Sequence, residues 1–133
     1  MSASDTPKDR RYTGTHEWVR VEGETAYVGI TDYAQEALGD IVFVELPPVG
    51  ESFRKEEEIA TVESVKADSP IFAPAGGTVV EVNETLTDTP ELLNQKPWDT
   101  TIYALRLDDP EEVAGLLDAG AYDAHVREEQ SSH

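Results

Sequence analysis

The sequence predicts a mainly β protein, a quasi-two-fold β sandwich or flattened barrel with short peripheral and C-terminal helices. Its apolar residues fall mostly in short runs rich in Val and Ile, bounded by Gly, Pro and acidic residues, which is typical of strands. Residues 39–44 (GDIVFV) align with residues 77–82 (GTVVEV), and each segment leads through a loop to a strand that begins with isoleucine. This weak repeat indicates two similar β units.

Strands are predicted wherever a run with high β propensity ends at a turn signal. The predicted strands cover residues 18–21, 25–30, 40–46, 59–64, 71–74, 78–83 and 101–107. Thr31 suits the N-cap of a short helix over residues 33–38, and Gly39 suits the position after its end. Thr89 followed by Pro90 predicts a further helical turn.

The beginning of the chain is polar and aperiodic. We therefore expect a disordered tail over residues 1–10, followed by one domain over residues 11–129 whose C-terminal helices occupy about residues 110–129. No apolar run approaches about 18 residues, the length that predicts a membrane span. The first residues also lack the apolar core of a signal peptide. A cytoplasmic location is expected.

Two C-terminal helices are predicted from caps and apolar spacing. Asp109 and Glu112 are spaced as a capping box at the start of the first helix. Apolar residues at i, i+3 and i+4 give this helix one buried stripe: Val113, Leu116 and Leu117. The second helix is predicted over residues 121–129, and we expect it to bury Tyr122 and Val126.

The charge balance excludes some partners. The 133 residues include 28 acids against 10 Lys and Arg, for a formal net charge of −18. Nucleic-acid binding is not expected, because contacts to phosphates need clustered Lys and Arg. A protein partner is expected to be electropositive where it docks.

The residues for common catalytic and metal sites are scarce. The chain has no cysteine, so any sulfur chemistry must come from a cofactor. Its histidines are His16, His125 and His133, and no two of them have metal-ligand spacing along the chain. His16 has no evident partner. We predict no metal site and no catalytic residues, and hence a protein that is not itself an enzyme.

Lys66 is the most informative residue. The chain has four lysines, and only Lys66 joins two matched β segments. An exposed turn on a rigid scaffold suits a side chain that must be modified by one enzyme and then enter the sites of others. Lys66 is therefore predicted to be a covalent attachment point.

The neighbours of Lys66 fit this interpretation. Val65 and Ala67 are small enough for the hairpin to enter a narrow cleft, and Ser64 precedes them. Glu63 and Asp68 flank the turn as candidate recognition residues for a modifying enzyme, although they can equally be ordinary surface acids of a hairpin.

Residues 63–67 (ESVKA) resemble the lipoyl-attachment hairpin of the glycine cleavage H-protein family. The resemblance extends in order from about residue 12 to residue 129. It includes His16-Glu17-Trp18-Val19, residues 29–35 (GITDYAQ), residues 38–47 (LGDIVFVELP) and residues 73–83. It implies a hybrid fold of the lipoyl/biotinyl type.

The resemblance also implies a function. Lipoate would be attached to Lys66 through an amide by a lipoate ligase or lipoyltransferase. The chain would then carry the aminomethyl group of glycine from a pyridoxal phosphate-dependent glycine decarboxylase to a tetrahydrofolate-dependent aminomethyltransferase. Dihydrolipoamide dehydrogenase would reoxidise the dithiol. The chain itself would be a non-catalytic carrier.

Members of this family shelter the loaded arm in a surface cleft, and Glu17 matches the family's acidic residue near it. Its carboxylate could pair with the ammonium-like end of the cargo, or it could be a plain solvent-facing strand residue. Trp18 is expected in the core. The chain departs from the family at Pro70, where an aspartate is usual, so that contact is expected to be lost or taken over by Asp68.

Other carriers remain as alternatives. The lipoyl domain of a 2-oxo acid dehydrogenase usually has aspartate before its lysine, where this chain has Val65, and a biotin carrier usually flanks its lysine with methionine. Two further alternatives are a relay protein that passes lipoate to other carriers and an unmodified scaffold of the same fold. Both would have the same hairpin, so the hairpin sequence does not distinguish them from a glycine cleavage carrier.

The acid excess and the small number of lysines lead to the hypothesis of a halophilic source. Repulsion between surface acids is screened at molar salt, where the Debye length is about 3 Å. We expect thermal melts to show a higher melting temperature in molar KCl than without added salt. Equal melting temperatures would contradict the hypothesis.

Overall fold

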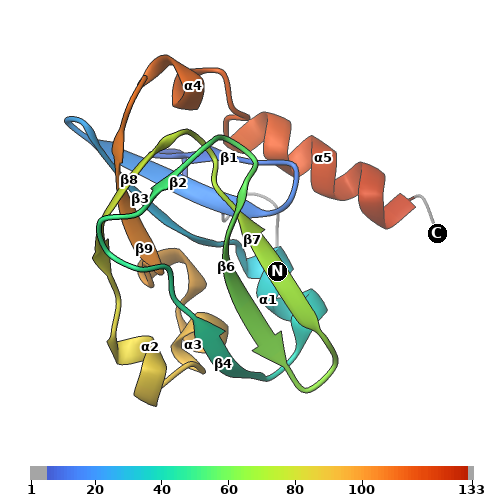
Figure 1. The fold of residues 1–133 in the computed structure, drawn as a ribbon. Coiled ribbons are helices and arrows are strands. Elements are labelled where there is room, and N and C mark those ends of the chain that lie inside the picture. Colours follow the sequence, from blue (N-terminus) through green and yellow to red (C-terminus); the bar gives the residue numbers. More distant parts are fainter. Residues whose placement is uncertain (1–5, 132–133) are drawn as a thin grey trace.

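The computed structural model describes residues 6–131 and contains two antiparallel sheets (Figure 1). The larger sheet has the strand order β1-β2-β3-β9-β8-β5, and the smaller has the order β4-β6-β7. The strands of the two sheets are β1 (Arg11–Tyr12), β2 (Glu17–Glu22), β3 (Thr25–Ile30), β4 (Ile41–Glu45), β5 (Ser52–Phe53), β6 (Glu58–Ser64), β7 (Asp68–Phe72), β8 (Gly77–Val82) and β9 (Tyr103–Leu107). The sequence predicted a β sandwich or a flattened barrel, and the structure is a flattened sandwich rather than a closed barrel.

The internal repeat predicted from the sequence has a structural counterpart. β4 pairs with β6, and β8 pairs with β9. The register of the first pair shifts between Ile41 and Phe43, and that of the second shifts between Val79 and Glu81. These positions correspond in the aligned segments, and the residues between them, Val42 and Val80, are 54% and 45% exposed. Both units therefore contain a β-bulge at the same step.

The apolar faces of the two sheets form the main core. It includes Val28 and Ile30 from β3, Val62 from β6 and Leu105 from β9, all at most 1% exposed. A second, aromatic cluster lies under the C-terminal helix α5 (Ala119–Ser131) and contains Tyr12, Trp18 and Tyr122. In the second cluster, Trp18 is 1% exposed and donates its indole N–H to the Pro97 carbonyl, so its predicted place in the core is confirmed.

The first predicted helix is confirmed with its caps. α1 (Asp32–Leu38) begins after Thr31, whose hydroxyl accepts a hydrogen bond from the backbone N–H of Ala34. Gly39 has a φ of 75° and donates its N–H to the Gln35 carbonyl, which ends the helix. The chain can therefore turn directly from α1 into β4.

The other short helices differ from the prediction. α2 (Thr85–Asp88) and the 3₁₀ turn η2 (Pro97–Asp99) were not predicted, and α3 (Leu92–Gln95) begins after Glu91 rather than at Pro90. The Thr89 carbonyl accepts from the Leu92 N–H. These turns fill the long connection between β8 and β9.

Only half of the capping box predicted at the C-terminal helices forms: the Asp109 carboxylate accepts the backbone N–H of Glu111 at 3.1 Å. α4 (Glu111–Ala114) ends before Leu116 and Leu117, and Glu112 does not return to the start of the helix. Instead, the Glu112 carboxylate accepts the backbone N–H of Gly76, 2.8 Å away, beside β8. A contact to a turn far away in sequence thus replaces the second half of the box.

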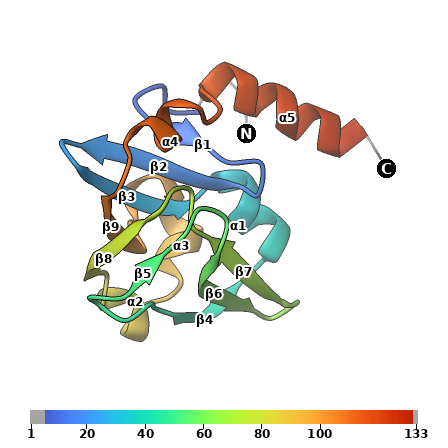
Figure 2. The same cartoon turned by 45° about the horizontal axis from the view of Figure 1, so that its top comes forward.

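The helix α5 lies along the outside of the body next to β1 in both views (Figures 1 and 2). It is longer than predicted at both ends, and it buries Tyr122 and partly buries Val126 as expected. Among residues 6–131, no helix has the length and apolar character needed to cross a membrane.

The predicted disordered tail is wrong for residues 6–10, which pack on the body. Thr6 is 8% exposed and donates its hydroxyl to Asp123 on α5. The Arg10 guanidinium donates to the Trp98 carbonyl and lies over the Trp18 ring at 4.6 Å. Residues 1–5 lie outside the described residues.

Gly29 in β3 provides a test of the packing. An added Cβ there would lie 2.5 Å from the Trp18 ring and 2.7 Å from the Thr100 carbonyl oxygen. We expect Gly29→Ala to destabilise the protein by about 1–3 kcal/mol, because the ring and a backbone oxygen must both move.

Gly115→Ala is the matched control. Gly115 has a φ of −84°, and the atom nearest to its added Cβ is 3.9 Å away. Chemical denaturation measures both variants, and an equal loss of stability in the two would contradict this account of Gly29.

Candidate functional site

Lys66 lies at the tip of the hairpin formed by β6 and β7, as the sequence predicted for this turn. The strands pair up to Glu63 and Asp68, so the tip contains Ser64, Val65, Lys66 and Ala67. Lys66 is exposed, and Val65 is 67% exposed. The hairpin projects from the body beside α1 (Figures 1 and 2). A large enzyme can therefore approach Lys66 from solvent.

The Ser64 hydroxyl organises the tip. It accepts the backbone N–H groups of Lys66 and Ala67, each at 3.2 Å, and donates to the Ala67 carbonyl at 3.0 Å. The Val65 N–H donates to the carbonyl of Asp40, which lies just before β4. The backbone at the lysine is thus held by a side chain and by a neighbouring segment.

The lysine amine rests on the end of α1. Its Nζ lies 3.5 Å from the Ala37 carbonyl oxygen, and its Cε lies 3.4 Å from the place where a Cβ on Gly39 would be. Free carbonyl groups give a helix C-terminus a partial negative charge, which favours a cation there. The lysine chain thus lies along the helix end beside Gly39.

Two acids face each other beside the tip. Glu63 and Asp68 are directly opposite each other in the antiparallel pair. Like charges in this arrangement cost stability. A pair of carboxylates next to an exposed lysine therefore gives the hairpin a distinctive charge pattern that a modifying enzyme could recognise.

A groove of about 580 Å³ lies at the other end of β7. Its walls come from four segments: residues 12–15 with residue 17, residues 55–56, residues 72–74 and residues 115–117. β7 connects this groove to the hairpin tip, because Phe72 lines the groove and Asp68 adjoins the tip. The exposed lysine and the groove therefore lie at opposite ends of the same strand.

Glu17 is the buried acid of this groove. It is 1% exposed, so it is not the solvent-facing strand residue that the alternative interpretation expected. One carboxylate oxygen accepts the hydroxyls of Thr13 and of Thr15, the latter at 2.6 Å. The other accepts the backbone N–H of Phe72 at 3.2 Å. The Thr13 hydroxyl also accepts the backbone N–H of Glu17.

Burial raises the pKa of the Glu17 carboxyl, and the hydrogen bonds from Thr13, Thr15 and Phe72 oppose that rise. Thr13 and Thr15 donate to one carboxylate oxygen, and Phe72 donates to the other. The acid that lines the groove is therefore held by donors from the loop before β2 and from β7.

Asp68 does not take the place of an acid at residue 70. It lies at the hairpin tip opposite Glu63, and the segments that line the groove do not include it. Pro70 lies in β7, an edge strand of the smaller sheet, where a residue without an N–H is tolerated. Among the described residues, Glu17 and Glu56 are the acids that line the groove.

The sequence interpretation missed the partners of Glu17. Thr13 and Thr15 precede the acid by four and two residues, and this local pattern of hydroxyls could have indicated a carboxylate cage. No local sequence pattern could have indicated the hydrogen bond from the Phe72 N–H, because Phe72 belongs to the other sheet.

His16 also has partners that the sequence did not reveal. Its ring contacts Tyr122 and Glu129 on α5, with separations of 2.8 and 2.9 Å. The expectation that this residue has no partner is therefore wrong.

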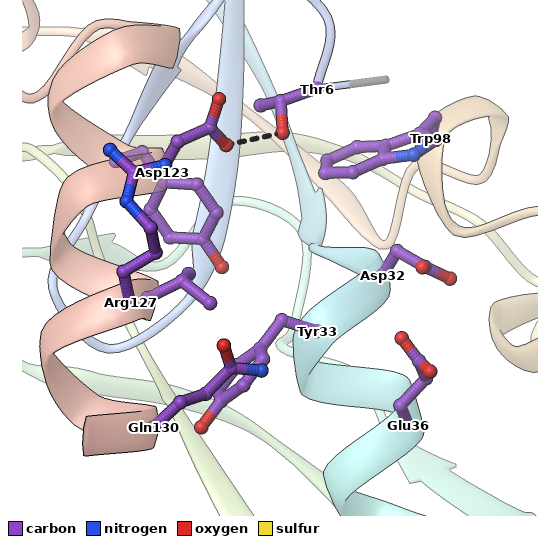
Figure 3. Close-up of a pocket in the computed structure, with 10 residues that line it drawn as sticks. Thr6, Asp32, Tyr33, Glu36, Trp98, Asp123, Arg127 and Gln130 are labelled. Atoms are coloured by element: carbon purple, nitrogen blue, oxygen red, sulfur yellow. Dashed lines mark hydrogen bonds between the residues drawn. The ribbon is translucent and has the colours of Figure 1, made fainter. Parts of the chain in front are cut away.

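A smaller hollow of about 120 Å³ lies between α1 and α5 (Figure 3). Asp32, Tyr33 and Glu36 from α1 border it, and Asp123 and Arg127 from α5 lie on the opposite side. The Thr6–Asp123 hydrogen bond spans one edge of it (Figure 3). The hollow lies against the partly buried Trp98 and is much smaller than the groove at Glu17.

Comparison with known proteins assigns the family. The family model described as "Glycine cleavage H-protein" matches residues 10–129. Glycine cleavage system H proteins of Pseudoalteromonas atlantica and Thermus thermophilus are 52% and 56% identical, covering 95% and 89% of this chain and 99% and 93% of theirs. The crystal structure of a Mycobacterium marinum H protein aligns with a TM-score of 0.84 and 39% identity, over 91% of this chain and 98% of its own. The chain belongs to the glycine cleavage H-protein family.

Proposed function

We propose that this protein is the lipoyl carrier of a glycine cleavage system, with lipoate attached through an amide to Lys66. One observation carries the proposal: Lys66 is exposed at the tip of a hairpin whose strand β7 runs back to a groove with a buried acid. The names of its relatives support the same function.

The residues of the hairpin fit a lipoyl group. The Nζ of Lys66 is accessible to an acylating enzyme, and the amide formed would keep one N–H that can still donate toward the Ala37 carbonyl. A lipoyl group supplies a dithiolane, whose sulfur can carry the aminomethyl group of glycine. The chain needs this sulfur from outside because it contains no cysteine.

The groove would protect the loaded arm. Water that reaches the aminomethyl carbon breaks its bond to sulfur and releases formaldehyde and ammonia, leaving a thiol. The Glu17 carboxylate, which lines the groove, would attract the amino end of the cargo, while the groove walls exclude water. Because the oxygens of Glu17 are held by Thr13, Thr15 and Phe72, they are oriented before the arm arrives.

The partners follow from this role. A lipoate ligase or lipoyltransferase would recognise Glu63, Asp68 and the tip residues around Lys66. Glycine decarboxylase, the aminomethyltransferase and dihydrolipoamide dehydrogenase would then meet the arm in turn. The net charge of −18 favours electropositive docking surfaces on these enzymes. We further propose a cytoplasmic location, in a saline cytoplasm.

Substitution of the attachment residue gives the first test. We expect Lys66→Arg to gain no lipoyl mass when treated with a lipoate ligase, because an arginine has no amine that the ligase can acylate. Its stability should change by no more than about 0.5 kcal/mol, since the side chain is exposed.

Lys96→Arg, also at an exposed position, is the matched control and should be modified like the wild type. Intact mass and peptide mapping measure both variants. A lipoyl increment that persists in Lys66→Arg would reject the attachment site, and a large loss of stability would show that Lys66 is structural.

Glu17→Gln tests the groove. The Thr13 and Thr15 hydroxyls can rotate to suit an amide, so the fold should persist, but the amide cannot form an ion pair with the cargo. We expect the aminomethyl-loaded variant to release formaldehyde roughly tenfold to a hundredfold faster than the loaded wild type.

The protection of the aminomethyl group by Glu17 should depend on pH in a definite direction. Because the pKa of Glu17 is raised, the wild type should lose its protection as the pH falls through that pKa, and the two proteins should then decay alike. Exposed Glu45→Gln is the control. Equal release rates for wild type and Glu17→Gln near pH 7 would remove Glu17 from the proposal.

A further inference from the structure

Two histidines and a glutamate gather where α5 meets the loop before β2. His125 and Glu129 are one helical turn apart on α5, and His16 lies in the loop between β1 and β2. The Nε2 of His16 lies 2.9 Å from one Glu129 carboxylate oxygen, and the Nε2 of His125 lies 2.9 Å from the other. One ligand atom from each residue lies within 4.8 Å of the other two.

The surroundings fix the orientation of His16. Its Nδ1 lies 2.8 Å from the Tyr122 hydroxyl, which in turn lies 2.6 Å from the Thr31 hydroxyl. The Tyr33 ring also packs against the imidazole, with 4.7 Å between the ring centroids. This leaves Nε2 directed at Glu129. A histidine that ligates a metal through one ring nitrogen is usually oriented by a hydrogen bond at the other, as the Nδ1 of His16 is here.

The backbone at His16 is unusual. Its φ is 72°, a left-handed conformation that is uncommon for residues other than glycine. The loop is held in this shape by hydrogen bonds from the His16 N–H to the Thr13 carbonyl and from the Thr31 N–H to the His16 carbonyl. Such conformations gather at functional positions. Here, the residue with the unusual backbone is His16, whose imidazole ring contacts α5.

We propose that His16, His125 and Glu129 form a binding site for a divalent transition-metal ion of the Zn²⁺ class. Imidazole and carboxylate are ligands that Zn²⁺ accepts, and three protein ligands leave a fourth position for water. Neighbouring ligand atoms in a tetrahedral zinc site are about 3.4 Å apart. The separations in the cluster are 2.9 Å for each His–Glu129 pair and at most 4.8 Å overall, so small rotations of these partly buried side chains would reach that spacing.

Metal binding would exchange existing contacts at both imidazoles. At His16, the Nε2 that now lies 2.9 Å from a Glu129 carboxylate oxygen would become a ligand. Coordination would replace a proton on Nε2, and the remaining proton would sit on Nδ1 and donate to the Tyr122 hydroxyl. The Nε2 of His125 now lies 2.9 Å from the Gly14 carbonyl oxygen and would exchange that contact for the metal.

A metal here would tie the C-terminal helix to the loop that builds the groove. The loop containing His16 also carries Thr13 and Thr15, which hold the Glu17 carboxylate. The side chains of His125 and Glu129 are 31% and 38% exposed, so an ion can enter from solvent. This site goes beyond the carrier function, and the sequence did not predict it, because His16 and His125 are far apart along the chain.

The test is a calorimetric titration of Zn²⁺ into the full chain expressed without lipoate, since a reduced dithiol would itself bind zinc. We expect one ion per chain. We also expect the melting temperature to rise by about 5 °C or more at a hundredfold excess of Zn²⁺ over its Kd. His125→Gln and Glu129→Gln should each weaken binding by at least about tenfold.

His133→Gln and Glu51→Gln are controls that keep all three ligands, and they should bind like the wild type. The exposed positions of His125 and Glu129 mean that their variants should fold, which circular dichroism can check. Absence of saturable binding would overturn the proposal. Equal binding by His125→Gln or Glu129→Gln, or loss of binding in His133→Gln, would overturn it as well.

Discussion

The hydrogen bond from the Phe72 backbone to the Glu17 carboxylate joins the two sheets of this protein at its groove. Glu17 belongs to β2 of the larger sheet, and Phe72 belongs to β7 of the smaller one. A carboxylate that is 1% exposed is unfavourable unless donors surround it, which explains why Thr13 and Thr15 also turn toward it. The cost of burying this acid therefore determines the shape of the loop, the position of β7 and the location of the groove together.

The hairpin combines a fixed backbone with a free side chain. Ser64 and the carbonyl of Asp40 hold the tip, while the lysine chain lies in the open along the end of α1. Gly39 ends α1 with a positive φ, and the lysine chain passes beside it. The sequence Leu38-Gly39-Asp40 thus contributes to the attachment site although it is distant from the lysine in sequence.

Local signals explain which features the sequence could predict. Thr31 and Gly39 were recognised because caps act within one helical turn, and the matching segments predicted two similar β units, although not the bulges at Val42 and Val80. The Glu112–Gly76 bond, the ordered residues 6–10 and the partners of His16 were not predicted, because each joins segments far apart in sequence. Lys66 itself was identified from its position between strands, whereas the donors around Glu17 needed the structure.

The segments around Tyr12 and before α5 meet at the groove, which makes α5 more than a cover for the core. Tyr12 pairs with Leu117 as an isolated β-bridge, so the segment before α5 forms one wall of the groove and β1 forms another. The Tyr12 ring stacks on Tyr122 of α5 at 4.7 Å, and Tyr122 contacts both His16 and Thr31. Displacement of α5 would therefore disturb the loop from Thr13 to Glu17. An interaction that fixes α5 to His16 would, by the same contacts, fix the donors that orient the Glu17 carboxylate.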